Sequence, residues 1–193
     1  MAGNIKLQGG AAGPDAVGAD LGGAVERLRD LHAAGPIVSG RGLEALIAGA
    51  TLGVSKKTWI LPGRREMGAA LLRGAAPDAL HSARPYRVVP AGPSPSARAG
   101  QAVGLGMAGE SALCFLGTGS VAYGTLAEVL GNLVPGVQFV VSWYQRPGPF
   151  ARPLSPLGLF RSAGLSVAEV DGSDAIAVYD AVRAGTVLVM AAV

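Results

Sequence analysis

The chain has 193 residues, a net charge of +3 and a single cysteine, Cys114. This length suits one domain with a sizeable core, and one cysteine excludes an intrachain disulfide. The basic residues are spread along the chain without a Lys/Arg block, which argues against a nucleic-acid-binding surface. Half of the residues are hydrophobic, and the mean hydropathy is +0.40. Such a composition indicates buried parallel strands and surfaces that other subunits cover.

The first 35 residues are interpreted as an N-terminal extension followed by a helix. The segment from Met1 to Gly23 is rich in Gly and Ala and has Lys6 as its only basic side chain, so it lacks the pattern of a signal or transit peptide. Apolar residues spaced three or four apart predict a helix over Asp20–Ala34: Leu21, Val25, Leu28 and Leu31. Residues 36–193 are expected to form the main body of a single domain.

Helical spacing and short apolar runs alternate along the rest of the chain. We expect helices at Arg41–Leu52, Arg65–Arg73, Ala99–Met107, Val121–Leu130, Leu157–Ala163 and Ala175–Ala184. We expect strands at Trp59–Pro62, Leu113–Leu116, Val137–Tyr144, Ser166–Val170 and Val187–Met190. Two proline-rich segments are expected to be loops: Arg84–Ala97 and Arg146–Pro156. This alternation predicts an α/β fold with a mostly parallel sheet and helices on both faces.

A glycine turn follows the buried strand at Leu113–Leu116. Gly117 and Gly119 flank Thr118 there, and the backbone N–H groups of such a turn could accept an anion. Arg64 and Arg65 could assist as phosphate partners.

A second glycine pattern, Gly104-x-Gly106-x-x-Gly109, has the spacing of a dinucleotide site but precedes a strand instead of following one. We therefore interpret it as a place of close helix packing.

Other kinds of site receive less support from the sequence. His32 and His81 lie far apart with no Cys or carboxylate at ligand spacing, so a metal site is not expected. The serines lack a plausible His–Asp arrangement, which disfavours a hydrolase. The apolar stretch Ser111–Gln145 is interrupted by glycine and proline, so no transmembrane span is expected. Cys114 lies in an apolar run and is expected to be an inert core thiol.

Three segments occur in a recognisable order along the chain: Gly42-Leu43-Glu44-Ala45, Trp59–Gly74 and Val170–Ala181. They resemble segments of the α subunit of 2-oxoacid (pyruvate or branched-chain) dehydrogenase E1 components, which bind thiamine diphosphate. The first is similar to that family's Gly-Gln-Glu-Ala motif, and the last to its Val-Asp-Gly segment. The resemblance covers Gly40 to Met190. It implies a thiamine diphosphate-binding, transketolase-like fold.

The chain departs from the family at the positions that the resemblance assigns to metal binding. The implied Asp falls on Thr118, and the implied Asn falls on Trp143 or Tyr144. A threonine hydroxyl carries no charge, whereas Mg²⁺ beside a diphosphate normally takes a carboxylate. Tryptophan has no acceptor and would fill the space of a cofactor.

The implied phosphate-binding Tyr-Arg pair is Arg64-Arg65, and the histidine that follows it in the family is Met67. Metal ligand and proton donor are therefore lost together. We expect no catalytic residue, no metal site and no bound cofactor. The vestigial cofactor-binding positions are Arg64, Arg65, Gly117, Thr118 and Gly119.

These departures predict a non-catalytic structural or assembly subunit, a pseudoenzyme whose partners are other subunits of a large complex or an E1β-like chain. One alternative is a divergent E1 α subunit that uses thiamine diphosphate and Mg²⁺ and decarboxylates a 2-oxoacid with a β subunit. Another is a free-standing anion-binding module that exposes Arg64 and Arg65 beside Gly117–Gly119. The expected location is an organelle (mitochondrion or plastid) in a eukaryote and the cytoplasm otherwise.

Overall fold

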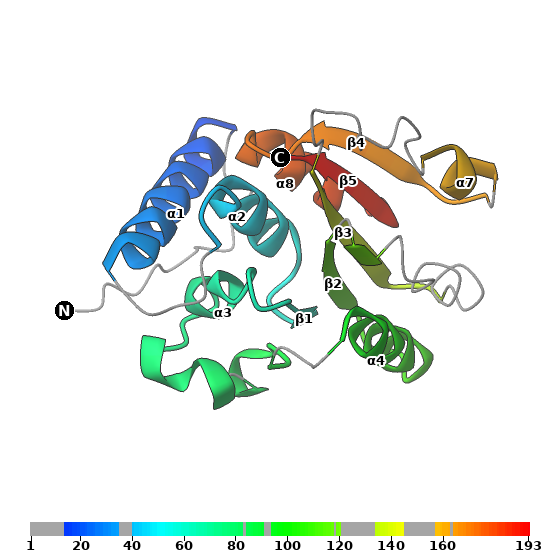
Figure 1. Ribbon diagram of the computed structural model, residues 1–193, viewed down its shortest axis with the longest axis horizontal. Coiled ribbons are helices and arrows are strands. Elements are labelled where there is room, and N and C mark those ends of the chain that lie inside the picture. Colours follow the sequence, from blue (N-terminus) through cyan, green and yellow to red (C-terminus); the bar gives the residue numbers. More distant parts are fainter. Residues whose placement is uncertain are drawn as a thin grey trace.

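A single parallel sheet organises the chain (Figure 1). The computed structural model describes residues 14–34, 40–82, 84–90, 94–117, 119–120, 134–144, 157–162 and 164–193. Within them the strands are β1 (Trp59–Leu61), β2 (Ala112–Gly117), β3 (Val137–Trp143), β4 (Val167–Asp171) and β5 (Leu188–Ala192). Their spatial order is β1-β2-β3-β5-β4, and every neighbouring pair is parallel. The predicted α/β fold with a parallel sheet is confirmed.

Helices cover both faces of the sheet, as predicted (Figure 1). The described helices are α1 (Pro14–Ala34), α2 (Glu44–Gly53), α3 (Gly68–Leu72), α4 (Pro95–Met107), α7 (Leu157–Ser162) and α8 (Ala175–Arg183), with 3-10 turns η1 (Pro77–Ser82) and η2 (Arg84–Tyr86). One core lies under α1, α2, α3 and α8, and the other under α4 and α7. Among the described residues no helix combines the length and apolarity needed to cross a lipid bilayer.

The inner strands β2, β3 and β5 are largely apolar on both sides because each side faces a separate core, whereas the edge strand β4 exposes Glu169 and Asp171. In β2, Leu113 and Phe115 belong to the core under α2, whereas Cys114 and Leu116 belong to the core under α4. Successive side chains of a strand point to opposite faces, so a strand covered on both faces has a continuous apolar run. The run at Leu113–Leu116, which predicted a buried strand, has this cause.

The edge strand β1 is partly covered by the segment that follows η2. The amide of Ile60 donates to the carbonyl of Arg87 at 2.9 Å, and the amide of Val89 donates to the carbonyl of Ile60 at 2.9 Å. Arg87 has a φ of 56°, a left-handed conformation that is uncommon for a residue other than glycine. These bonds attach the 87–89 segment to the sheet and occupy backbone groups that an edge strand otherwise exposes.

The predicted loop over Arg84–Ala97 is wrong at both of its ends, because η2 begins at Arg84 and α4 begins at Pro95. The Ser94 hydroxyl accepts a hydrogen bond from the amide of Ala97 at 3.1 Å and so caps α4. Proline suits the first helical position, where its missing N–H leaves no bond unmade. A proline interpreted as part of a loop therefore starts a helix.

Other predicted boundaries differ less. The first helix begins at Pro14 instead of Asp20, and the remaining described helices and strands lie within a few residues of their predicted positions. The predicted helix Val121–Leu130 and the predicted loop Arg146–Pro156 lie outside the described residues.

Glycine allows α2 and α8 to pack closely. A Cβ atom on Gly49 would lie 2.5 Å from the carbonyl oxygen of Ala175 and 2.9 Å from the Cβ of Val178. The next glycine of the same helix, Gly53, would place a Cβ 3.0 Å from the carbonyl oxygen of Tyr179. The distance between the two helices thus depends on these positions having no side chain.

We expect Gly49→Ala to lower the free energy of unfolding by about 1–3 kcal/mol, because the added methyl group must push α8 away. Gly100→Ala is the matched control, since a Cβ at this exposed position of α4 meets no atom within 4 Å. It should leave stability unchanged or raise it by about 0.5–1 kcal/mol. Urea unfolding of both variants is the measurement, and equal stabilities would contradict the packing role of Gly49.

Candidate functional site

The carboxyl ends of β1, β2 and β3 lie side by side and bring several predicted site residues to one edge of the sheet. Gly117, at the end of β2, is in register with Ser142 of β3. Arg65 follows β1, and its guanidinium lies 5.0 Å from the centre of the Tyr144 ring, just past the end of β3. Ligands of parallel α/β sheets bind outside the carboxyl ends of the strands, so this edge is the first candidate site.

The structure places the predicted vestigial residues unequally. Arg65 and Gly117 lie at the carboxyl edge, and the cation–π contact of Arg65 is made with one of the aromatic residues that replace the implied Asn. Arg64, Arg65 and Gly119 are exposed, whereas Gly117 is partly buried. Thr118 lies outside the described residues.

Two buried side chains of opposite charge type, which the sequence did not predict, lie near each other beside the end of β1. Glu66 is 6% exposed and Arg98, on α4, is 8% exposed. Both side chains lie against Gly63, where a Cβ would be 2.5 Å from Oε2 of Glu66 and 3.2 Å from Nη2 of Arg98. Glycine at this position makes room for the two charged groups.

Burial raises the pKa of Glu66 above its ordinary value, and the positive charge of Arg98 opposes that rise. The same surroundings include Cys114 of β2: burial raises the pKa of its thiol to about 12. A fully protonated, fully buried thiol is a poor nucleophile. The prediction that Cys114 lies in the core is confirmed, and the low reactivity of its thiol is expected from this burial.

A second buried pair, also unpredicted, joins α1 to α2. Nδ1 of His32 and Oε1 of Glu44 are 2.9 Å apart, and Oε2 of Glu44 accepts a hydrogen bond from the amide of Gly42 at 2.9 Å. Burial opposes ionisation of Glu44, but the hydrogen bonds from His32 and from backbone amides outweigh it and hold the pKa of Glu44 below its ordinary value. Glu44 belongs to the segment that resembles Gly-Gln-Glu-Ala, so this motif forms a helix-to-helix contact.

Gly40 lies between the His32–Glu44 pair and the segment that follows β1 at the carboxyl edge of the sheet. A Cβ on Gly40 would collide with the carbonyl oxygen of Arg65 and lie 3.0 Å from Nε2 of His32. The end of α1 and the loop that carries Arg65 therefore both lie against Gly40.

The side chains at the end of β3 do not offer the ligands that a thiamine diphosphate–Mg²⁺ complex takes. The end of β3 offers the hydroxyl of Ser142, the indole of Trp143 and the phenol of Tyr144, none of which is a carboxylate or an amide oxygen. Trp143 and Tyr144 pack against different cores, one on each face of the sheet. Across the described parts of the chain, no three His, Cys, Asp or Glu side chains gather as metal ligands would.

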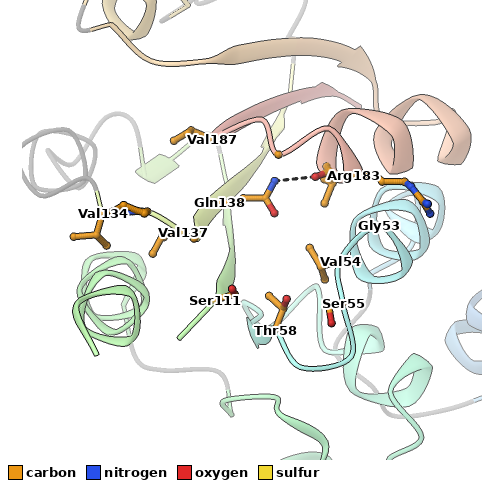
Figure 2. Close-up of a pocket in the computed structure, with 14 residues that line it drawn as sticks. Gly53, Val54, Ser55, Thr58, Ser111, Val134, Val137, Gln138, Arg183 and Val187 are labelled. Atoms are coloured by element: carbon orange, nitrogen blue, oxygen red, sulfur yellow. Dashed lines mark hydrogen bonds between the residues drawn. The ribbon is translucent and has the colours of Figure 1, made fainter. Parts of the chain in front are cut away.

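A pocket of about 380 Å³ lies at the opposite, amino end of the sheet (Figure 2). Val54 and Thr58 line it from the loop between α2 and β1, Val137 and Gln138 from the start of β3, and Arg183 from the end of α8. The side-chain amide of Gln138 donates to the carbonyls of Val182 at 2.9 Å and Thr186 at 3.0 Å, so β3 is tied to the end of α8. No pattern in the sequence indicates this pocket.

The glycine pattern interpreted as close helix packing lies near this pocket. A Cβ on Gly106 of α4 would be 2.5 Å from a methyl carbon of Val137 and would also collide with Val134. The packing interpretation is thus confirmed for Gly106. It is wrong for Gly104 and Gly109, where a Cβ would meet no described atom within 4 Å.

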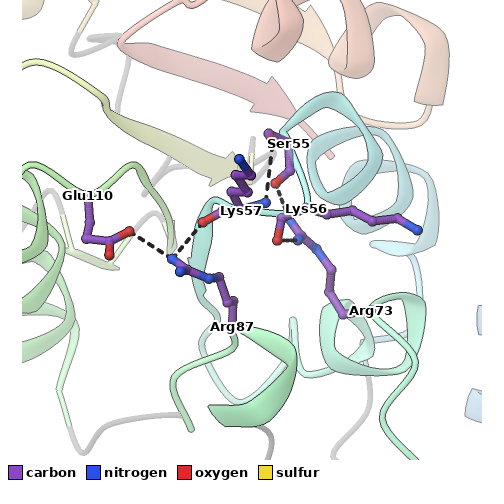
Figure 3. Close-up of polar contacts among 6 residues, drawn as sticks. All are labelled: Ser55, Lys56, Lys57, Arg73, Arg87 and Glu110. Carbon is purple, nitrogen blue, oxygen red and sulfur yellow. Dashed lines mark hydrogen bonds and ion pairs between the residues drawn. The ribbon is translucent and has the colours of Figure 1, made fainter. Parts of the chain in front are cut away.

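Two arginines hold the loop between α2 and β1 by its backbone (Figure 3). The guanidinium of Arg73 donates to the carbonyls of Lys56 at 2.8 Å and Ser55 at 3.0 Å. The guanidinium of Arg87 donates to the carbonyl of Lys57 at 2.9 Å and forms an ion pair with Glu110 at 2.8 Å. Burial lowers the pKa of Arg73 to about 10, so the group stays charged near neutral pH.

In comparisons with known proteins, no protein-family model and no curated protein sequence matches the chain.

We expect the stability of the wild type to fall relative to Glu66→Gln as pH rises above 4.5. The folded protein holds the Glu66 proton more tightly than the unfolded chain, in which the pKa is near 4.5. The stability that this proton contributes is present below that value and is lost as pH rises through the raised, folded-state pKa. Urea unfolding over a pH series measures the effect.

The matched control is Glu26→Gln, which removes an exposed carboxylate from α1. Its unfolding free energy should follow the wild type in parallel over the same pH series. A Glu66→Gln profile parallel to the wild type would contradict the assignment of a raised pKa to Glu66.

Proposed function

We propose that the chain is a non-catalytic structural or assembly subunit of a larger protein complex, descended from an E1 α-like thiamine diphosphate enzyme. The observation that carries the proposal is the packing of two aromatic side chains at the end of β3, at the carboxyl edge of the sheet. Trp143 and Tyr144 occupy the end of β3, where the resemblance implies a metal ligand. Side chains that pack into the two cores there leave the fold intact and remove the ligands.

The buried Glu66–Arg98 pair supports the same proposal. An enzyme that binds an anionic cofactor keeps its charged groups available to the ligand. Here the buried carboxylate and guanidinium lie against the same glycine, Gly63, and offset each other's charge. Replacement of a ligand-binding centre by an internal charge pair preserves a rigid domain that other subunits can use.

A divergent, active E1 α subunit remains the second candidate. It is favoured by the position of Arg65 and Gly117 at one edge of the sheet, as the resemblance implies for phosphate binding. This candidate requires cofactor binding with a β partner, and the two candidates therefore differ in a measurable way.

We expect thiamine diphosphate with Mg²⁺ to leave the unfolding free energy of the chain unchanged. A ligand present at about one hundred times its Kd adds about 2.7 kcal/mol, so thermal unfolding with and without the cofactor distinguishes the candidates. Thr118→Asp alone should not create stabilisation while Trp143 keeps its place. Stabilisation of that variant by the cofactor would contradict the steric part of the proposal.

Because an E1 α subunit shares its cofactor with a β subunit, the same question must be asked of the native complex. Native mass spectrometry of the protein from its own source, with Mg²⁺ and thiamine diphosphate present, gives the composition directly. A large assembly without cofactor on this chain is the expected result. A compact complex with one β-like chain and the mass of the cofactor would overturn the proposal.

A further inference from the structure

Two exposed lysines lie side by side on the loop between α2 and β1. Lys56 and Lys57 are two of the three lysines in the chain. Neither ammonium group has a hydrogen bond or an ion pair with another described residue, whereas Glu110, the acidic residue of this region shown in Figure 3, is paired with Arg87. The loop therefore presents uncompensated positive charge.

The backbone of this loop is fixed before any partner arrives. Arg73 and Arg87 together bind three consecutive carbonyl groups, from Ser55 to Lys57. Figure 3 shows both guanidinium groups on the loop backbone while the lysine side chains extend away from it. A surface held in one conformation loses less entropy when it binds.

The pocket at the amino end of the sheet adjoins the same loop. Val54, Ser55 and Thr58 line it, and valines from β3 and α8 form apolar parts of its wall (Figure 2). Arg183 adds another positive charge, and none of the described residues that line the pocket is acidic. Positive charge beside a partly apolar hollow matches a ligand that carries negative charge next to an apolar group.

We propose that this amino-end surface is the docking site for an acidic, extended segment of a partner subunit. Carboxylates of the segment pair with Lys56 and Lys57, and an adjacent aliphatic side chain enters the pocket. The inference rests on the proposed role as an assembly subunit and names the chemistry of the partner. A protein segment fits better than nucleic acid, because no aromatic ring among the described lining residues offers a base-stacking surface.

The first test measures binding of a synthetic peptide that places one leucine among glutamates, by fluorescence anisotropy at low salt. Lys56→Glu/Lys57→Glu should weaken binding about tenfold or more, since each reversal turns an attraction into a repulsion. Added salt should weaken wild-type binding. The charge-matched control Arg29→Glu/Arg161→Glu alters exposed arginines on α1 and α7. Equal losses in the two double variants would overturn the inference.

A second variant tests the pocket without changing charge. Ser111 is exposed and lines the pocket, so Ser111→Trp should fill the pocket while the core stays intact. We expect this substitution to weaken binding of the leucine-containing peptide several-fold and to leave binding of a glutamate-only peptide unchanged. Equal effects on both peptides would show that the pocket takes no apolar side chain. Stronger binding of single-stranded RNA than of peptide would overturn the choice of a protein partner.

The native complex separates this inference from the proposed function. If the Lys56→Glu/Lys57→Glu variant is lost from the assembly while the Arg29→Glu/Arg161→Glu variant is retained, the docking site and the assembly role are both supported. If both variants enter an assembly of unchanged mass, the docking site is wrong and the assembly role stands. If the wild type itself is found in no assembly, the proposed function fails.

Discussion

Burial of a parallel sheet on both faces is the constraint from which the rest of this structure follows. Parallel strands need crossover connections, and these connections place helices over the sheet. Side chains must then be apolar at successive strand positions, which is why Leu113 and Cys114 reach different cores. In the inner strand β3, the polar side chains Gln138 and Ser142 lie near the two ends of the strand. Both sites discussed above lie at those ends because the interior of the sheet has no room for them.

Charged side chains are arranged differently at the two ends of the sheet. At the carboxyl end, Glu66 and Arg98 lie inside the protein, where low polarity makes an unmatched charge costly. Burial favours the neutral form of Glu66, and the positive charge of Arg98 opposes that preference. At the amino end, Arg73 and Arg87 bind backbone carbonyls, and the lysines of the same loop keep their charge in solvent. The buried charges Glu66 and Arg98 are thus not available for contact, whereas the exposed lysines of the amino end are.

Much of the fold was predictable because it depends on local patterns. Apolar runs such as Val137–Tyr144 and the helical spacing in Asp20–Ala34 report the strands and helices that the structure contains. The start of α4 was missed although its signal was present: Ser94 followed by Pro95 is a favourable helix start. The four prolines between Arg84 and Ala97 indicate a loop, but Pro95 occupies a position at which a helix accepts proline.

The candidate sites were less predictable because they combine residues that are distant in sequence. Glu66 meets Arg98 only because α4 crosses the sheet beside β1, and His32 meets Glu44 only because α1 folds back on α2. Sequence periodicity indicates which residues share one face of a helix. It does not indicate which other element packs against that face. The position of Arg65 at the carboxyl edge was inferred from a resemblance, whereas its contact with Tyr144 depends on how two strands end.

Cys114 gives this sheet an internal reporter of its own dynamics. It is the only thiol in the chain and lies in β2, between β1 and β3. Because the side chain is fully buried, an alkylating reagent can reach it only when the strands separate from a covering helix. The rate of alkylation under native conditions therefore counts opening events of the sheet, and its dependence on denaturant distinguishes local opening from global unfolding.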